Sequence, residues 1–367
     1  MNPDIDPGPS LPADVVSQAG ATGVLESPLL WHALVVAAVV VGFTGVRHRA
    51  RFVAVLLVAA ALAWANASVG YLRTPADLLV ALGVPAPRDS PQRLDRLDLP
   101  DPANGIPHGP IRVLLPPGYD NPANAHRRYP VVQLLPGSPG GTSDDWLTAG
   151  GVADTVRSLL DHGVIPPTVV VLPDVSAGAP TTDYECLDVP DGPRVETYLT
   201  RTVQPWVDRH YRTIPDRAHR ALGGMSGGGF CALNTGLRHL DTYGTLLVSL
   251  PYDDLGDAAA LLGDHPDLVR ANTPRDYLPT MAFDRPVSVM LSAGADSRDD
   301  VVTARRVACG LRARGQRVAM RVERGHGHDW HAARAALPYL LAFAAAHTPR
   351  EQEARPPDHP RWTRPVR

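Results

Sequence analysis

A serine in a glycine-rich segment is the strongest candidate for a catalytic group. The segment ALGGMSGGGF contains Gly224, Ser226 and Gly228 in a GxSxG pattern, between a short apolar run and a helical pattern. This pattern is typical of a serine on a tight strand-to-helix turn, where glycine avoids side-chain clashes and tolerates strained dihedral angles. Amide groups at the start of the following helix would point at a negative oxygen beside the serine. We therefore predict that Ser226 is a nucleophile.

A serine hydroxyl needs a base within hydrogen-bonding reach, and the sequence offers one near its C-terminal end. The segment RGHGHDWHAAR follows the last predicted strand and contains His326, His328 and His331. Three close histidines could instead bind a metal ion, but no cysteine or HExxH pattern accompanies them. We predict that His328 is the base and that the protein uses neither a metal nor a cofactor.

The carboxylate that orients such a histidine should lie between the serine and the histidine in chain order. The segment LSAGADSRDD ends a predicted strand and contains Asp296, Asp299 and Asp300. Asp296 is nearest the strand end and is preferred, while Asp299 or Asp300 could cap the following helix instead. Asp253 and Asp254, after the preceding strand, are further candidates or plain turn residues.

Two backbone amides could stabilise the negative charge that develops on a substrate oxygen. The loop LLPGSPGGTSDDW, residues 134–146, follows an early predicted strand, and its glycines would let the backbone approach a substrate. We predict that the N–H groups of Ser138 and Gly227 form this oxyanion pair, a kind of contact worth about 3 kcal/mol per donor. An ordinary surface turn is the alternative.

Short apolar runs alternate with helical stretches from residue 111 onward. Runs rich in Val and Leu are typical of strands that are covered on both faces. Their alternation with helices predicts an α/β fold, with a mostly parallel central sheet and helices on both faces. The predicted strands are 111–115, 131–135, 169–172, 218–222, 245–249, 287–292 and 318–322, and the predicted helices are 152–160, 195–210, 228–239, 301–314 and 332–345.

Two apolar runs near the N-terminus, residues 29–46 and 52–72, have about the 20 residues that a helix needs to cross a bilayer. Arg47, Arg49 and Arg51 lie between them, whereas the first 28 residues contain neither Lys nor Arg. By the positive-inside rule that loop is cytoplasmic. The alternatives are a buried helical hairpin of a soluble domain and a signal peptide, but the basic residues of a signal peptide should precede a single apolar core. The sequence thus predicts a two-helix hairpin in the cell membrane, with the catalytic domain outside the cytoplasm.

The remaining segments divide the 367 residues as follows. Residues 1–28 are predicted to be flexible, 29–72 to form the hairpin, 73–108 to be a linker, 109–347 to form the catalytic domain, and 348–367 to be a tail. The net charge is -3 and no long basic run occurs outside the segment near residue 50, which argues against a nucleic-acid partner.

Several segments together resemble one family, the esterase D and feruloyl-esterase-like branch of the α/β-hydrolases, which also includes secreted mycolyltransferases. They are LLPPGYD with RRYPVVQLLPG, VVVLPD, WVDRHYRTIPDRAHRALGGMSGGGFCAL, and GHDW, in this order within residues 110–345. The resemblance implies the α/β-hydrolase fold and a triad of Ser226, Asp296 and His328. Members usually carry His or Asp before the oxyanion-loop glycine, whereas this sequence has Pro136.

The same resemblance bears on the three cysteines. ECLD and GFCAL contain Cys186 and Cys231 and resemble a matched pair in exported members of the family, which implies a disulfide in a chain segment outside the membrane. Two buried free thiols are the alternative. Cys309 lies on a predicted helix and is expected to be packed.

Three functions fit these observations. The first is a serine esterase that cleaves a carboxylic ester through an acyl-enzyme, on a cell-envelope or lipid substrate. The second is an acyltransferase that moves the acyl group to a sugar or lipid hydroxyl. Mycolyltransferases place an arginine shortly after the oxyanion-loop glycine, and GSPGGTSDDW has no match, which favours hydrolysis. The third is an inactive envelope binding protein, which the complete set of candidate Ser, His and Asp residues disfavours.

Overall fold

The computed structural model describes residues 6–44, 47–82, 84, 92–138 and 140–349. Among these residues, one sheet has eight strands in the order β1-β2-β4-β3-β5-β6-β7-β8. Strand β2 is antiparallel to both its neighbours, β1 and β4, and all other neighbouring strands are parallel. The strands are β1 Leu94–Asp98, β2 Pro110–Leu114, β3 Val131–Leu135, β4 Val169–Pro173, β5 Arg220–Met225, β6 Thr245–Ser249, β7 Ser288–Gly294 and β8 Arg317–Glu323. The predicted mostly parallel sheet is confirmed.

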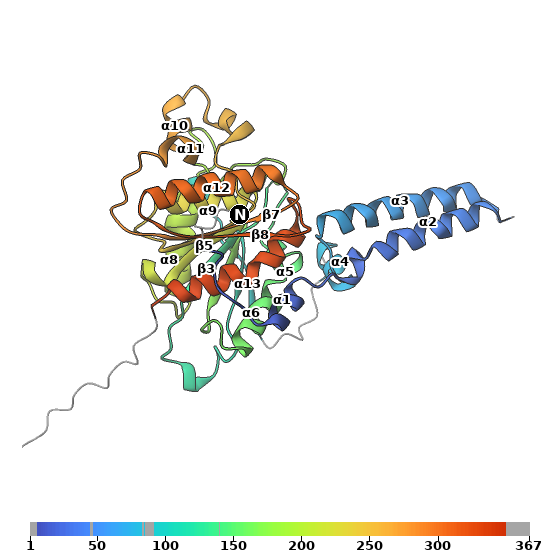
Figure 1. Cartoon of the computed structure of the whole chain (residues 1–367), viewed down its shortest axis with the longest axis horizontal. Coiled ribbons are helices and arrows are strands. Elements are labelled where there is room, and N and C mark those ends of the chain that lie inside the picture. Colours follow the sequence, from blue (N-terminus) through green and yellow to red (C-terminus); the bar gives the residue numbers. More distant parts are fainter. Residues whose placement is uncertain (1–5, 45–46, 83, 85–91, 139, 350–367) are drawn as a thin grey trace, which may run out of the picture.

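Helices cover both faces of this sheet (Figure 1). One face packs against α7, η4, α8, α9 and α12. The other packs against α1, α5, α6 and α13. Every residue of β3, β4, β6 and β7 is buried, as expected for strands between two helical layers. The helices of this domain are α5 Asp145–Thr148, α6 Val152–Asp161, α7 Val195–Thr197, η4 Tyr198–Val203, α8 Gln204–His210, α9 Gly227–Arg238, α10 Pro266–Ala271, α11 Pro274–Tyr277, α12 Arg298–Ala313 and α13 Trp330–His347.

The N-terminal segment, predicted to be flexible, is packed on the domain over much of its length. Helix α1, Ala13–Ala19, buries Val15 against the layer that contains α6 and α13. Before it, the carbonyl oxygen of Asp6 accepts a hydrogen bond of 2.8 Å from the Met320 amide of β8. Two buried apolar residues, Val15 and Ala19, and one backbone pairing with β8 thus hold a segment whose local composition is that of a loop.

The predicted linker also contains regular structure. Helix α4 spans Pro75–Ala81, and strand β1 pairs along its whole length with β2 at the edge of the sheet. An edge strand has one partner only, so the charged sequence LDRLD can face solvent while its backbone completes the sheet. Residues 83 and 85–91 of the predicted linker, and residues 350–367 of the predicted tail, lie outside the described residues.

Helices α2, Pro28–Gly42, and α3, Arg49–Val69, lie side by side and project from the domain as a hairpin (Figure 1). Helix α3 has 21 residues, and an 18-residue window within it has a mean hydropathy of 2.1, so by length and composition it could cross a membrane. Helix α2 has 15 residues and is shorter than the predicted span 29–46. We call residues 28–42 and 49–65 the hairpin shaft, and residues 23–26 and 66–73 the hairpin base.

Candidate active site

Ser226 stands on a strained turn between strand β5 and helix α9. Its backbone φ is 54° and its ψ is -121°, in a region that non-glycine residues rarely adopt. A Cβ on Gly224 would come within 2.2 Å of the Gly228 carbonyl oxygen, and one on Gly228 within 2.2 Å of the Pro136 carbonyl oxygen. Only glycine fits at either position. The turn therefore has the shape that the sequence pattern predicted, and it presents the serine hydroxyl at the carboxyl end of the sheet.

His328 reaches this hydroxyl from the loop between β8 and α13. Its Nε2 atom lies 2.8 Å from Ser226 Oγ, and its Nδ1 atom lies 2.8 Å from Asp300 Oδ2. The side chain of His328 is 39% exposed, whereas that of Asp300 is 11% exposed. A hydrogen bond from Nδ1–H to the carboxylate leaves the lone pair on Nε2 facing the serine hydroxyl. This arrangement lets the imidazole take up the serine proton.

The acid beside His328 is Asp300, which corrects the preference for Asp296. Asp296 is exposed in the turn after β7, where its amide donates to the His326 carbonyl oxygen over 2.9 Å. Asp300 lies in the first turn of α12. Side chains on a helix tilt toward its N-terminus, so this carboxylate points back toward the strand ends and meets the imidazole. Asp299, on the same helix turn, is exposed.

The more distant acidic candidates have other partners. Asp253 is buried and accepts hydrogen bonds from the guanidinium groups of Arg275 and Arg306. These two cations hold the pKa of Asp253 below its usual value, against the opposing effect of burial, which is the largest single influence. Asp254 pairs with Arg275. Both residues serve the structure of the turn after β6.

The amides predicted to form the oxyanion pair lie close together. The Ser138 nitrogen lies 3.1 Å from the point where a Cβ on Gly227 would sit, so the loop after β3 passes directly beside the start of α9. Gly227 is the first residue of that helix, and first-turn amides have no acceptor within their own helix. Pro136 is buried with its carbonyl oxygen against Gly228. The proline that departs from the family pattern thus lies where the loop contacts the nucleophile turn.

The other two histidines of the loop point elsewhere. His331 Nε2 lies 3.0 Å from the Ala67 carbonyl oxygen in the hairpin base, and its Nδ1 lies 3.0 Å from Arg334. The His326 ring stacks on the His331 ring, with centroids 6.1 Å apart. Within the described part of the chain, no three His, Cys, Asp or Glu side chains gather as metal ligands would.

A disulfide between Cys186 and Cys231 joins the loop after β4 to helix α9, five residues beyond Ser226. The free cysteine, Cys309, is exposed and not packed as predicted. Next to the disulfide, Glu185 is buried and accepts a hydrogen bond from the Tyr252 hydroxyl. Burial, reinforced by the nearby charge of Asp183, raises the pKa of Glu185 to about 9. Sequence reasoning missed this buried acid, because ECLD resembles an ordinary polar turn.

With this geometry in place, comparison with known proteins identifies the family. The model of the Esterase family matches residues 108–347, which is most of the chain. The chain belongs to the Esterase family. Membership in this family supports an enzyme that hydrolyses esters.

Individual relatives of this Esterase-family chain match over shorter stretches. An uncharacterized protein of Corynebacterium glutamicum is 30% identical over 186 residues, which cover 48% of this chain and 42% of the relative. Esterase Rv1288 of Mycobacterium tuberculosis is 32% identical over 130 residues, covering 34% of this chain and 25% of the relative. The matched part thus spans less than half the length of these curated relatives.

A solved ferulic acid esterase has a TM-score of 0.60 and 24% sequence identity, and the match covers 70% of this chain and 99% of that one. At this identity the likeness shows a shared fold. The fold is that of the α/β-hydrolases, as the sequence predicted.

Proposed function

We propose that the protein is a serine esterase in which Ser226, His328 and Asp300 form the catalytic triad. The observation that carries this proposal is the continuous chain of two 2.8 Å hydrogen bonds from Ser226 Oγ through the imidazole to the Asp300 carboxylate. An unactivated hydroxyl is a poor nucleophile at neutral pH, and such a chain is the arrangement that activates it.

In the first step Ser226 Oγ attacks the ester carbonyl carbon and passes its proton to His328 Nε2. The amides of Ser138 and Gly227 donate hydrogen bonds to the oxyanion, and Asp300 stabilises the imidazolium. The tetrahedral intermediate then expels the alcohol, which takes the proton from His328 and leaves an acyl group on Ser226. In the second step His328 accepts a proton from water, the hydroxide oxygen attacks the acyl carbon, and the carboxylic acid leaves as Ser226 regains its proton.

We further propose that the hairpin shaft anchors the protein in the cell membrane and that the catalytic domain lies outside the cytoplasm. Helix α3 is about 32 Å long at 1.5 Å per residue, which matches the hydrocarbon thickness of about 30 Å. Trp31 and Trp64 lie near the hairpin base, where an aromatic belt is expected, and the arginines at 47, 49 and 51 lie at the far tip. The disulfide fits an oxidising compartment. A cell-envelope or lipid ester is the substrate class that fits this location.

Labelling with a fluorophosphonate probe tests the catalytic proposal. The wild-type protein should become labelled and should hydrolyse short p-nitrophenyl esters, whereas Ser226→Ala should lose labelling and at least about 10⁴-fold in kcat. Ser138→Ala is a matched control, because it removes a hydroxyl beside the turn but keeps the proposed amide donor. Labelling that persists in Ser226→Ala would remove this serine from the mechanism, and acyl transfer to an added sugar would identify a transferase.

A further inference from the structure

The hairpin shaft and the hairpin base differ in what holds them. In the shaft, Ala38 and Ala60 are the buried residues of α2 and α3, and larger apolar side chains such as Val58 and Trp64 are 61% and 57% exposed. The base, by contrast, is closed by polar contacts. The Asn66 side chain donates to the Leu25 and Leu72 carbonyl oxygens over 3.0 and 2.8 Å and accepts from the Leu72 amide over 2.8 Å.

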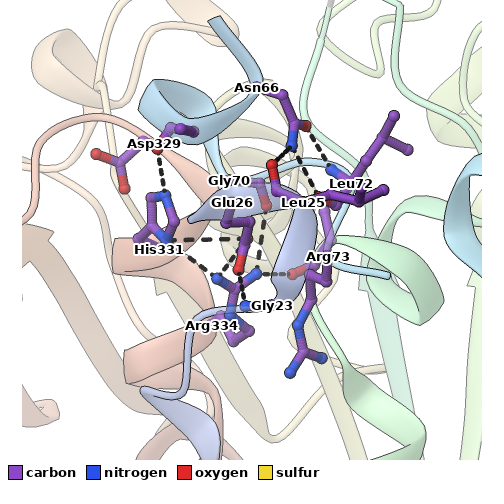
Figure 2. Close-up of polar contacts among 12 residues, drawn as sticks. Gly23, Leu25, Glu26, Asn66, Gly70, Leu72, Arg73, Asp329, His331 and Arg334 are labelled. Atoms are coloured by element: carbon purple, nitrogen blue, oxygen red, sulfur yellow. Dashed lines mark hydrogen bonds and ion pairs between the residues drawn. The ribbon is translucent and has the colours of Figure 1, made fainter. Parts of the chain in front are cut away.

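A buried ion pair fastens this base to the catalytic domain (Figure 2). Arg334 of α13 and Glu26 of the base are each 2% exposed, and Arg334 Nη2 lies 2.7 Å from Glu26 Oε1. Arg334 Nη1 donates to the carbonyl oxygens of Ala149 and Gly70 over 2.7 and 3.3 Å. Because each charge is buried with several partners, loss of one partner would leave the other uncompensated. The hairpin base therefore has one fixed position on the domain.

That position is at the active-site edge of the sheet. The Tyr71 hydroxyl of the base donates to Asp145 over 2.8 Å, and Asp145 ends the loop that carries Ser138. The Tyr71 ring also packs edge-on against Trp330, two residues after His328, with ring centroids 6.5 Å apart. The base thus contacts both segments that line Ser226. Figure 1 shows the shaft projecting away from the domain on the side where α5 lies.

We propose that the substrate is an ester of an amphiphile that stays embedded in the bilayer during the reaction. This substrate rests on the proposed esterase function and membrane insertion, and it gives a function to the polar contacts that join the hairpin base to the domain. If the shaft lies in the membrane, the base lies at the membrane surface. The Glu26–Arg334 ion pair and the Tyr71–Asp145 hydrogen bond then keep the edge that carries Ser226 facing the headgroup region. An ester carbonyl in that region is then presented at a high and constant local concentration, which a freely swinging domain would lose.

The test uses the full chain reconstituted in phosphatidylcholine and phosphatidylglycerol vesicles, with two substrates measured side by side. One is a water-soluble p-nitrophenyl butyrate, and the other is a fluorogenic long-chain acyl glycerolipid embedded in the same vesicles. Asn66→Ala loosens the base without touching the triad. Its matched control is Ser68→Ala, since the exposed Ser68 hydroxyl donates to the Trp64 carbonyl oxygen within its own helix and, among the described residues, to no group of the domain.

We expect Asn66→Ala to lower the rate on the embedded ester by about fivefold or more. Its rate on the soluble ester, and both rates of Ser68→Ala, should stay within about twofold of wild type. Equal loss on both substrates would mean that the base merely supports the fold, and no loss on either would mean that its position is irrelevant; both overturn the inference. If Asn66→Ala does not fold, Tyr71→Phe, which keeps the ring against Trp330 but removes the hydroxyl that donates to Asp145, takes its place under the same criteria.

Three failures remain distinguishable. A wild-type protein that cleaves neither ester contradicts the esterase function, and one that does not float with vesicles contradicts membrane insertion. A wild-type protein that floats and cleaves the soluble ester but leaves the embedded one intact contradicts this inference alone. Self-association through the shaft with no dependence on lipid would assign the exposed apolar surface to a second copy of the chain instead.

Discussion

The central sheet and the hairpin shaft contain similar apolar residues but use them in opposite ways. In β6, Val248 is completely buried between the helical layers, whereas Val58 in α3 is 61% exposed. The sheet is buried by the protein itself, because helices of the same chain pack on both of its faces. In the shaft, α2 and α3 pack mainly against each other, and many of their large apolar side chains are exposed. Apolar composition therefore shows that a segment must be removed from water, and the tertiary structure shows whether other parts of the protein bury it.

Polar groups show the reverse contrast. Charged side chains such as Asp296 are exposed on the surface of the domain, whereas at the hairpin base a complete ion pair, Glu26 with Arg334, is buried. A buried pair contributes little net stability but strongly disfavours arrangements in which the partners separate. The base thus determines orientation, while the sheet provides most of the buried apolar surface.

The largest expected effect is a loss of catalysis in the domain that leaves anchoring by the hairpin unchanged. Asp300→Asn should lower kcat on a soluble ester by about 10³- to 10⁴-fold, because the amide no longer stabilises the imidazolium or its tautomer. Vesicle flotation of this variant should match wild type. Asp296→Asn is the control and should keep nearly full activity, since Asp296 is exposed in the turn. An equal loss in Asp296→Asn would contradict the assignment of Asp300.

A matched pair of truncations tests the comparison between sheet and shaft directly. Val248→Ala removes two methyl groups from the packed core and should lower the free energy of unfolding by about 2 kcal/mol. Val58→Ala makes the same change in the exposed shaft and should alter it by less than about 0.5 kcal/mol. Urea unfolding in mild detergent, followed by circular dichroism, measures both. Similar losses in the two variants would show that the shaft is packed against the domain.

The smallest expected effect concerns a buried acid of the domain, Glu185. Its pKa is raised to about 9, whereas the ordinary value is 4.5, so the folded state retains a proton that the unfolded chain has already released. Between these two values the unfolding free energy of wild type should therefore fall as the pH rises.

The variant Glu185→Gln has no titratable group at this position, so its unfolding free energy should not show this fall. The difference in unfolding free energy between Glu185→Gln and wild type should therefore rise by about 1 kcal/mol or more in favour of the variant from about pH 5 to about pH 8. Unfolding curves at these pH values provide the measurement. The conservative change Asp183→Asn serves for comparison, because it removes the neighbouring charge and should weaken the same trend. Parallel curves for wild type and Glu185→Gln would show that Glu185 ionises normally.

Most of the catalytic domain could be predicted from the sequence. Strands β3 and β6 have the predicted bounds, since their runs of Val and Leu are uninterrupted and fully buried. The GxSxG turn and the His328 loop could be found because steric demands at a nucleophile turn restrict residue types locally. The chain order of strands and helices then predicted that the two would meet at one edge of the sheet.

The choice of acid could not be made from the sequence. Asp296, Asp299 and Asp300 lie within five residues, and all are near the end of β7. What separates them is the direction of each side chain, which depends on where α12 begins. A shift of one residue turns a helical side chain by about 100°, so proximity in sequence carries little information on contact with the imidazole.

The N-terminal third shows the same limit over longer distances. The sequence by itself determined which segments are apolar and must be buried. It also determined the tight turn at Ser226. Only the tertiary structure decided that α1 and β1 join the domain and that Glu26 pairs with Arg334, 308 residues away. Local patterns report local sterics and burial, whereas a buried ion pair has no local signal, because each partner alone resembles an ordinary surface charge.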